Sequence, residues 1–219
     1  MLDLGCGVGE YVRAFARVGA HAMGCDVAGR RLVEARARGA TGLVQAAGEA
    51  LPYRDASFDV VVLNEVIEHV TNDRATMREV ARILAPGGVV IIYAPNRLDP
   101  FETHGIYLGK RYVFGNIPLV NWLPRFLRDR LVPHARAYTA AEIDWVATEG
   151  GLHIIDHSYV YPGFDNVASR APLLARLLRW ACYAAEDSSV LRRFGLSHLV
   201  VLRKAPSETA PQTAGNAPI

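Results

Sequence analysis

The sequence has little cysteine, no long apolar run and almost no net charge. Its three cysteines, Cys6, Cys25 and Cys182, form no C-x-x-C pair and are odd in number, which favours a reducing, cytoplasmic setting over a disulfide framework. We find no uncharged apolar stretch of membrane-spanning length and no basic-then-apolar leader, which argues against a membrane span and a signal peptide. The net charge of +2 is too small to make a basic binding surface the default.

Apolar runs alternate with amphipathic stretches along most of the 219 residues, and this order is typical of an α/β fold. We predict a doubly wound, mostly parallel, seven-stranded sheet with strands at 1–4, 21–26, 41–45, 58–63, 88–94, 152–161 and 197–203. The clearest helices are predicted at 10–18, 29–38, 73–84 and 139–149. Thr139 and Glu142 form a capping-box pattern, and Pro86 with two glycines is expected to end the third of these helices.

The chain is read as one domain over 1–203 with an insertion at 96–138 and a disordered tail at 204–219. The insertion has seven basic and three acidic side chains, a net charge of +4. Apolar residues recur at helical spacing through its 117–132 stretch, so we expect a helical insertion with an amphipathic lid helix and with Arg128 on the polar side.

Glycines come after the first predicted strand in a distinctive spacing. Gly5, Gly7 and Gly9 come directly after an acid at Asp3 and an apolar residue, and glycine lets the backbone turn sharply beneath a ligand. A dinucleotide fingerprint has its third glycine three positions after the second, whereas here the interval is two. Asp26 ends the second strand, where a carboxylate accepts hydrogen bonds from ribose hydroxyls.

This G-x-G-x-G form resembles motif I of the class I S-adenosylmethionine-dependent methyltransferases. The segments 46–52, 57–70 and 79–88 look like later signatures of the same family, in the correct order and close to its small-molecule branch, which includes ubiquinone-biosynthesis enzymes. The resemblance covers about the first 95 residues. It implies a Rossmann-like methyltransferase fold with an antiparallel last strand, and S-adenosylmethionine as the cofactor.

Carried over by position, the resemblance implies a set of cofactor-binding residues. The methionine part would be lined by Asp3, Gly5, Cys6, Gly7 and Gly9, the ribose held by Asp26 with Val27 beside it, the adenine flanked by Glu49 and Ala50, and the amino-acid end approached by Asn64. Ala47 stands where many members of the family have an acid that accepts from the adenine amino group. The family also has a helical segment before its first strand, so we expect a more open cofactor site here.

The turn after the fourth strand holds the residues with chemistry to offer. His69 is the candidate general base, since an imidazole titrates near neutrality; the alternative is that it caps or packs the following helix. Glu65 and Glu68, three residues apart and next to His69, also form a candidate divalent-metal site, similar to that of metal-assisted ubiquinone-biosynthesis O-methyltransferases and of methyltransferases that modify RNA 3′ ends. His104 in the insertion is a possible further ligand.

Taken together, the sequence predicts methyl transfer from S-adenosylmethionine to a small-molecule acceptor. A hydroxyl oxygen is the preferred acceptor atom, and a nitrogen or carbon is less favoured. The alternatives are a metal-assisted RNA methyltransferase and a non-catalytic cofactor-binding module. Nucleic acid is disfavoured by the low net charge, and the basic, aromatic 117–132 stretch is a candidate for peripheral membrane contact.

Overall fold

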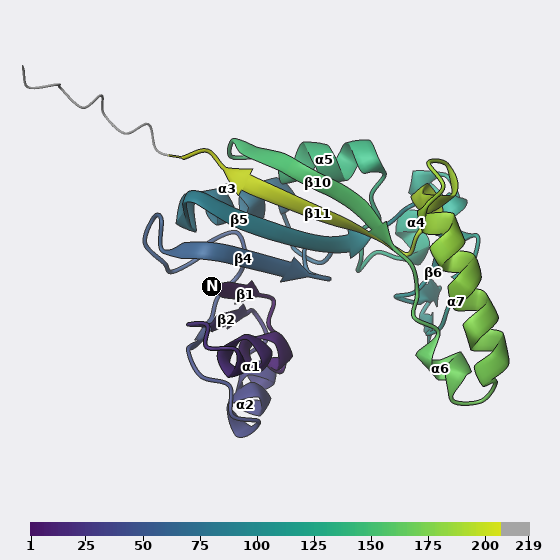
Figure 1. The fold of residues 1–219 in the computed structure, drawn as a ribbon, viewed down its shortest axis with the longest axis horizontal. Coiled ribbons are helices and arrows are strands. Elements are labelled where there is room, and N and C mark those ends of the chain that lie inside the picture. Colours follow the sequence, from purple (N-terminus) through teal and green to yellow (C-terminus); the bar gives the residue numbers. More distant parts are fainter. Residues whose placement is uncertain (207–219) are drawn as a thin grey trace, which may run out of the picture.

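The computed structural model describes residues 1–206, apart from the side chain of Asn166. Seven strands form the central sheet in the order β10-β11-β5-β4-β1-β2-β3 (Figure 1). The strands are β1 (Leu2–Leu4), β2 (Met23–Asp26), β3 (Leu43–Gln45), β4 (Phe58–Asn64), β5 (Leu84–Pro95), β10 (Leu152–Val160) and β11 (Ser197–Lys204). The first five are parallel, and β11 lies antiparallel between β5 and β10. The predicted sheet, its strand number and its antiparallel last strand are therefore confirmed.

Helices cover the sheet through two hydrophobic clusters. The larger cluster joins β1, β4, β5 and β11 to α3 (Asp73–Ile83) and α5 (Ala140–Ala147). The smaller one joins α1 (Glu10–Arg17) and α2 (Gly29–Ala37) around Val12 and Leu32. Both helix pairs begin close to their predicted positions, since the apolar spacing that suggested them is the face that each buries. No helix within residues 1–206 is long and apolar enough to cross a membrane.

The start of α5 and the end of α3 were both predicted from local sequence patterns. Thr139 and Glu142 form the predicted capping box, in which the Thr139 side chain accepts from the Glu142 amide and the Glu142 carboxylate accepts from the Thr139 amide. The end of α3 was predicted at residue 84, one residue too late, and the next strand begins four residues before its predicted start at 88. The helix stops at Ile83, and Leu84 already pairs with Phe58, so Pro86 lies within β5 rather than ahead of it.

The insertion differs most from the prediction. The 117–132 stretch is not one helix: it comprises β9 (Ile117–Pro118), a 3₁₀ turn (Val120–Trp122) and α4 (Arg125–Leu131). Leu119 adopts a left-handed φ of 65°, and the residue before Pro124 is extended, as the proline ring requires. The predicted faces are also reversed, because Arg128 is 1% exposed and Phe126 is 73% exposed.

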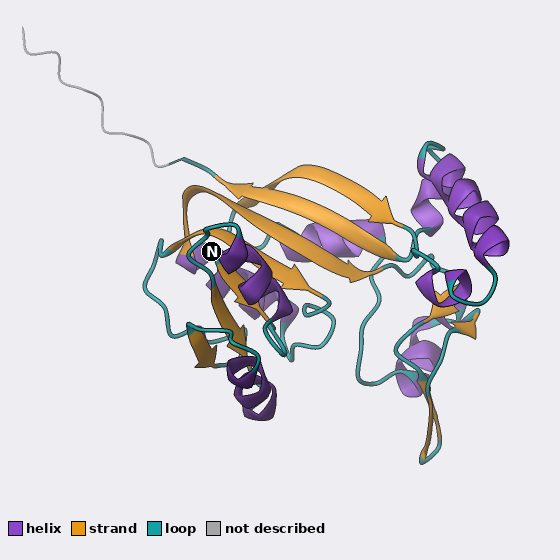
Figure 2. Cartoon of the chain, turned by 60° about the horizontal axis from the view of Figure 1, so that its bottom comes forward, coloured by secondary structure: helices purple, strands orange, loops and turns teal. Residues whose placement is uncertain are grey.

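Short strands complete the insertion, and further helices precede β11. The insertion contains β6 (Phe101–Glu102) paired with β9, and the hairpin of β7 (Ile106–Leu108) and β8 (Arg111–Val113). Two helices that the sequence did not predict, α6 (Asp165–Ala168) and α7 (Pro172–Glu186), lie between β10 and β11. Figures 1 and 2 show these elements gathered beyond one end of the large sheet, around the carboxyl end of β5.

The predicted tail begins within a strand. Lys204 belongs to β11, and its ammonium donates to the carbonyl oxygens of Ala81 and Leu84, each at 2.7 Å. Residues 207–219, for which disorder was predicted, lie outside the described residues.

Candidate active site

The glycine turn after β1 is held by the acid that ends β2. One carboxylate oxygen of Asp26 accepts from the Gly7 amide at 2.8 Å, and the other accepts from the Ala28 amide at 2.7 Å. Gly7 has a φ of 51°, and a Cβ built on it would meet no atom within 4 Å. A Cβ on Gly5 would instead come within 2.3 Å of Val66. The turn therefore lets β1 and the loop after β4 approach each other and leaves open space above Gly7.

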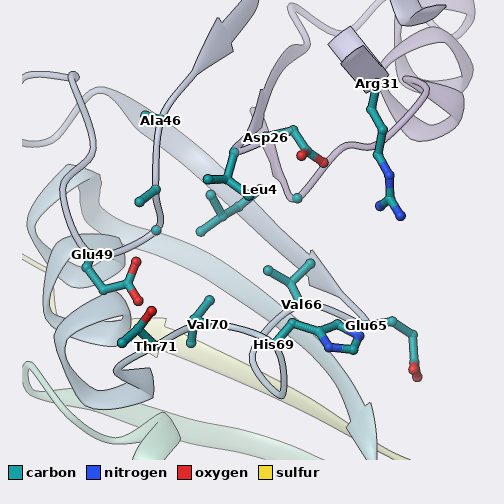
Figure 3. Close-up of a pocket in the computed structure, with 14 residues that line it drawn as sticks. Leu4, Asp26, Arg31, Ala46, Glu49, Glu65, Val66, His69, Val70 and Thr71 are labelled. Carbon is teal, nitrogen blue, oxygen red and sulfur yellow. The ribbon is translucent and has the colours of Figure 1, made fainter. Parts of the chain in front are cut away.

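A cavity opens at this carboxyl edge of the parallel strands, which is where open α/β sheets bind ligands. Figure 3 shows Asp26 and Arg31 on one side of it, Glu49 and Thr71 on another, and His69 beside Glu65 on a third. Its walls come from the ends of β1 and β2, the loop after β3 and the loop after β4. The lining residues are Leu4, Gly5, Asp26, Val27, Arg31, Ala46, Ala47, Gly48, Glu49, Glu65, Val66, His69, Val70 and Thr71.

Six of the predicted site residues are thus brought together around the cavity: Gly5, Asp26, Val27, Glu49, Glu65 and His69. Glu49 also accepts from the Asn72 amide at 3.0 Å, which ties the loop after β3 to the start of α3. Arg31, Thr71 and the apolar pair Val66 and Val70 were not predicted. The sequence indicates their place in the site only through their position, because they come a few residues after Asp26 or Glu65.

The other predicted site residues lie outside the cavity lining. They are Asp3, Cys6, Gly7, Gly9, Ala50 and Asn64 from the cofactor set, and Glu68 from the candidate metal site. Cys6 is buried against Val12 and Leu32, and burial raises the pKa of its thiol to about 12. Gly9 lies close to Ala40, since a Cβ added to Gly9 would come within 2.7 Å of the Ala40 side chain. Cys6 and Gly9 therefore serve the packing of α1 and α2 as well as the turn.

Asp3 is a buried acid with an unmet hydrogen-bonding capacity. It is 2% exposed, and its Oδ2 has no hydrogen-bond partner among the described residues. Burial, assisted by the negative charge of Asp26, raises the pKa of Asp3 to about 7. An unsatisfied acid beneath a glycine turn suits a ligand that brings a positive charge or donors.

Two carboxylates and two imidazoles meet after β4. Glu65 has a left-handed φ of 54° and starts a tight turn. His104 reaches this turn from the insertion, with its Nε2 3.5 Å from Glu65 Oε2 and 3.8 Å from Glu68 Oε1. His69 Nε2 is also 3.8 Å from Glu68 Oε1, and ligand atoms of Glu68, His69 and His104 lie within 4.8 Å of one another.

The electrostatics of this cluster are those of an incomplete site. Glu68 is 2% exposed, neither of its oxygens has a hydrogen-bond partner within residues 1–206, and burial raises its pKa to about 7. Burial lowers the pKa of His69, whose Nδ1 lies 2.9 Å from the His134 carbonyl oxygen, so Nδ1–H donates and the Nε2 lone pair is free. Burial also disfavours charge on His104, but its carboxylate neighbours, Glu102 foremost, outweigh this and raise its pKa to about 11.

Comparison with known proteins agrees with this geometry. A family profile described as a methyltransferase domain matches residues 2–92. The chain is 35% identical over 136 residues to a ubiquinone biosynthesis O-methyltransferase of Maricaulis maris, covering 57% of this chain and 49% of that protein. It is 39% identical over 94 residues to a probable tRNA methyltransferase 9B of Mus musculus, covering 42% of this chain and 20% of that protein.

The whole fold has a solved counterpart. An S-adenosylmethionine dependent methyltransferase from Mesorhizobium loti superposes with a TM-score of 0.64 at 23% identity, covering 93% of this chain and 89% of the other. This likeness shows that the chain has the fold of that methyltransferase. The chain therefore resembles the class I S-adenosylmethionine-dependent methyltransferases in sequence over residues 2–92 and in its fold. It spans between a fifth and about half of the length of the two curated relatives named above.

Proposed function

We propose that the protein transfers the methyl group of S-adenosylmethionine to a hydroxyl oxygen of a small-molecule acceptor. The observation that carries the proposal is one cavity with the carboxylate of Asp26 on one wall and His69 of the carboxylate–imidazole cluster on another. The oxygen acceptor is also supported by the printed activity of the ubiquinone biosynthesis relative, an O-methyltransferase.

Each wall has a proposed part in holding the cofactor. Both Asp26 oxygens keep a second lone pair for the ribose hydroxyls. Glu49 and Ala50 flank the adenine from the loop after β3, with Val27 beside the ribose. Asp3, Asn64 and the glycine turn, including Cys6 and its backbone, receive the methionine end. The open space at Gly7 and the unpartnered Asp3 oxygen both fit a charged ligand there.

The chemistry asks more of geometry than of covalent help. The sulfonium of S-adenosylmethionine supplies an already activated methyl group, so the main task of the protein is to align the acceptor oxygen with it and to exclude water. Val66 and Val70 give the cavity an apolar wall for this purpose. A proton must still leave the acceptor hydroxyl, and the residues after β4 are placed to deal with it.

We infer that the cluster of Glu65, Glu68, His69 and His104 holds a divalent cation. Two carboxylates and two imidazoles suit Mn²⁺, Fe²⁺ or Zn²⁺, and a cation would give the two oxygens of buried Glu68, which lack a hydrogen-bond partner among the described residues, a direct ligand contact. Such an ion lowers the pKa of a coordinated hydroxyl. His69 then serves as a ligand through its free Nε2, whereas without the ion the same lone pair serves as a general base.

Cofactor binding is tested by isothermal titration of the protein with S-adenosylhomocysteine. We expect binding, and an affinity at least tenfold weaker for Asp26→Asn, because the amide keeps the size but loses the charge that accepts from the ribose. Asp59→Asn is the matched control, since Asp59 is exposed and away from the cavity. A wild-type protein that does not bind the ligand would remove the proposal altogether.

Acceptor and cation are tested in one turnover assay with a panel of phenols, catechols, amines and a short RNA. We expect methylation of a hydroxyl substrate that stops on chelation and returns with Mn²⁺ or Zn²⁺. Full activity in chelator ends the cation proposal, and His69→Ala then tests the base, with a rate loss of tenfold or more expected. Methylation of the RNA alone would favour the tRNA-methyltransferase likeness instead.

A further inference from the structure

The largest completely buried side chain in the described part of the chain is an arginine, and it lies in the insertion. Arg128 of α4 is 1% exposed. Its Nε–H donates to Asn121 Oδ1 at 3.1 Å, and its Nη1 donates to the Ala135 carbonyl oxygen at 2.9 Å. Its Nη2 donates to Glu102 Oε2 at 2.8 Å. Every nitrogen of the guanidinium therefore has a protein partner in a region that water does not reach.

Glu102 divides its two oxygens between this arginine and the cluster after β4. While Oε2 accepts from Arg128, Oε1 accepts from the His104 amide at 2.8 Å and lies 3.1 Å from His104 Nδ1. Glu102 is 1% exposed, so these contacts account for its charge. One carboxylate thus connects the folded insertion directly to the histidine that reaches the candidate cation site.

The contact fixes both the tautomer and the direction of the His104 ring. In the neutral ring that a bound cation requires, a carboxylate at Nδ1 keeps the hydrogen on that atom and leaves Nε2 as the coordinating nitrogen. The opposite edge of the ring then faces Glu65 and Glu68, at 3.5 and 3.8 Å. A histidine on a loop has several rotamers, and this contact leaves one of them favoured.

Stability does not explain why the insertion buries this ion pair. Taking two charges out of water costs several kcal/mol per ion, and a well-packed apolar pair of similar volume often stabilises a protein at least as well. Asn121 and the Ala135 carbonyl are also committed to the pair. The arrangement is understandable if the orientation of the carboxylate matters, because Arg128 fixes Glu102 and Glu102 fixes His104.

We propose that Glu102 is a positioning residue that orients His104 for cation binding, with Arg128 as the anchor that holds Glu102 in place. This inference rests on the cation site in the proposed function. The ion pair inside the insertion thereby determines how tightly the site after β4 binds its ion.

The test is calorimetric titration of Mn²⁺ and Zn²⁺ into full-length protein stripped of metal, without cofactor or acceptor. We expect Glu102→Gln to weaken cation affinity by about 10- to 100-fold, the usual effect of losing a carboxylate partner of a metal-binding histidine. Glu34→Gln is the matched control, because Glu34 pairs with Arg38 in an exposed salt bridge on α2. It should bind the cations as the natural protein does.

Glu102→Gln leaves Arg128 buried without its counter-charge and is at risk of misfolding. A second variant, Glu102→Met with Arg128→Met, removes both charges together and should keep a cooperative thermal transition while losing the same affinity. Nitrogen-15 spectra of the histidines give a readout independent of affinity. We expect the Nδ1–H tautomer of His104 in the cation-bound natural protein and a mixture of tautomers in the double variant.

The outcomes separate the two proposals. Unchanged affinity and an unchanged His104 tautomer in a folded double variant would overturn the positioning role while leaving the cation site intact. If the natural protein binds neither ion but binds S-adenosylhomocysteine and methylates an acceptor, the cation site and this inference both fall and the methyltransferase assignment stands.

Discussion

The Oδ2 atom of Asp26 lies 2.8 Å from the amide nitrogen of Gly7, so the acid that ends β2 holds the glycine turn that comes after β1. The second oxygen of the same carboxylate holds the Ala28 amide at the entrance to α2. Two neighbouring strand ends are therefore fixed by one side chain. The binding edge of the sheet is formed before any ligand arrives, which reduces the ordering that binding must impose.

Replacing Gly7 should separate binding from folding. Gly7→Ala introduces a Cβ that meets no protein atom and points into the space above the turn, at a left-handed φ that costs an alanine about 1–2 kcal/mol. We expect at least a tenfold loss of S-adenosylhomocysteine affinity by calorimetry. Gly19→Ala is the control: Gly19 has a φ of 85° and equally open space, and it follows α1 rather than the first strand. Equal affinity losses in both variants would show that the effect is only backbone strain.

Asp3 should make cofactor affinity depend on pH near neutrality. Its pKa of about 7 means that the carboxyl gains its charge only above that pH, and a ligand with a positive amino group favours the charged form. We expect S-adenosylhomocysteine to bind more weakly at pH 6 than at pH 8 in the natural protein. Asp3→Asn should bind weakly at both values. A natural protein with the same affinity at both pH values would contradict this role.

The same pKa has the opposite effect on stability. Because the folded state binds the Asp3 proton more tightly than the unfolded state does, stability is lost as the pH rises from about 4 to about 7. Asp3→Asn should therefore melt at a higher temperature than the natural protein at pH 8 and at a similar one near pH 4. An acid that destabilises the fold but strengthens binding would be typical of a functional site.

Ala47 offers a gain of function. It lines the cavity at the position where many members of the family have an acid for the adenine amino group. We expect Ala47→Asp to tighten S-adenosylhomocysteine binding about 3- to 10-fold, the usual net value of one added hydrogen bond. Ala184→Asp adds the same charge at an exposed position on α7, outside the cavity lining, and should change little. A looser complex for Ala47→Asp would show that the adenine is held elsewhere.

His198 should contribute to acid sensitivity. It is fully buried in β11 between His157 and the Tyr138 carbonyl oxygen, and burial lowers its pKa to about 4. The unfolded chain takes up this proton near pH 6.5, so stability falls as the pH drops from 6.5 towards 4, by up to about 3 kcal/mol for this group.

Urea unfolding at pH 7 and pH 4.5 measures this contribution. His198→Gln should reduce the difference in unfolding free energy between the two pH values, whereas the exposed His153→Gln should leave it unchanged. A His198→Gln protein with the natural pH slope would place the acid sensitivity in other groups.

The sheet was predictable because its central strands, β1 and β4, are mostly buried. Continuous apolar runs such as Val60–Leu63 have few alternatives in a chain of this size, and the glycine spacing determines the turn after the first strand. Gly5, Asp26 and His69 could therefore be placed at one edge from the sequence alone. The connection of His104 to that edge was only a possibility, since it depends on how the insertion folds.

The fold of the insertion was not predictable because it depends on buried polar contacts of Arg128. An apolar repeat through 117–132 predicts a helix with its arginines in water, but Arg128 found buried partners in Glu102 and Asn121, which no periodicity encodes. Residues two positions apart lie on nearly opposite faces of a helix, so burial of Arg128 leaves Phe126 exposed. Peripheral membrane contact through this stretch stays a prediction.

The order of strands has a consequence for how the molecule is made. The last strand along the described chain, β11, is an interior strand that pairs with β5 on one side and with β10 on the other. During synthesis the backbone groups of β5 and β10 that pair with β11 therefore stay unpaired until residues 197–204 have left the ribosome. Nascent chains halted before that point should be the forms of this protein most inclined to aggregate and to need a chaperone.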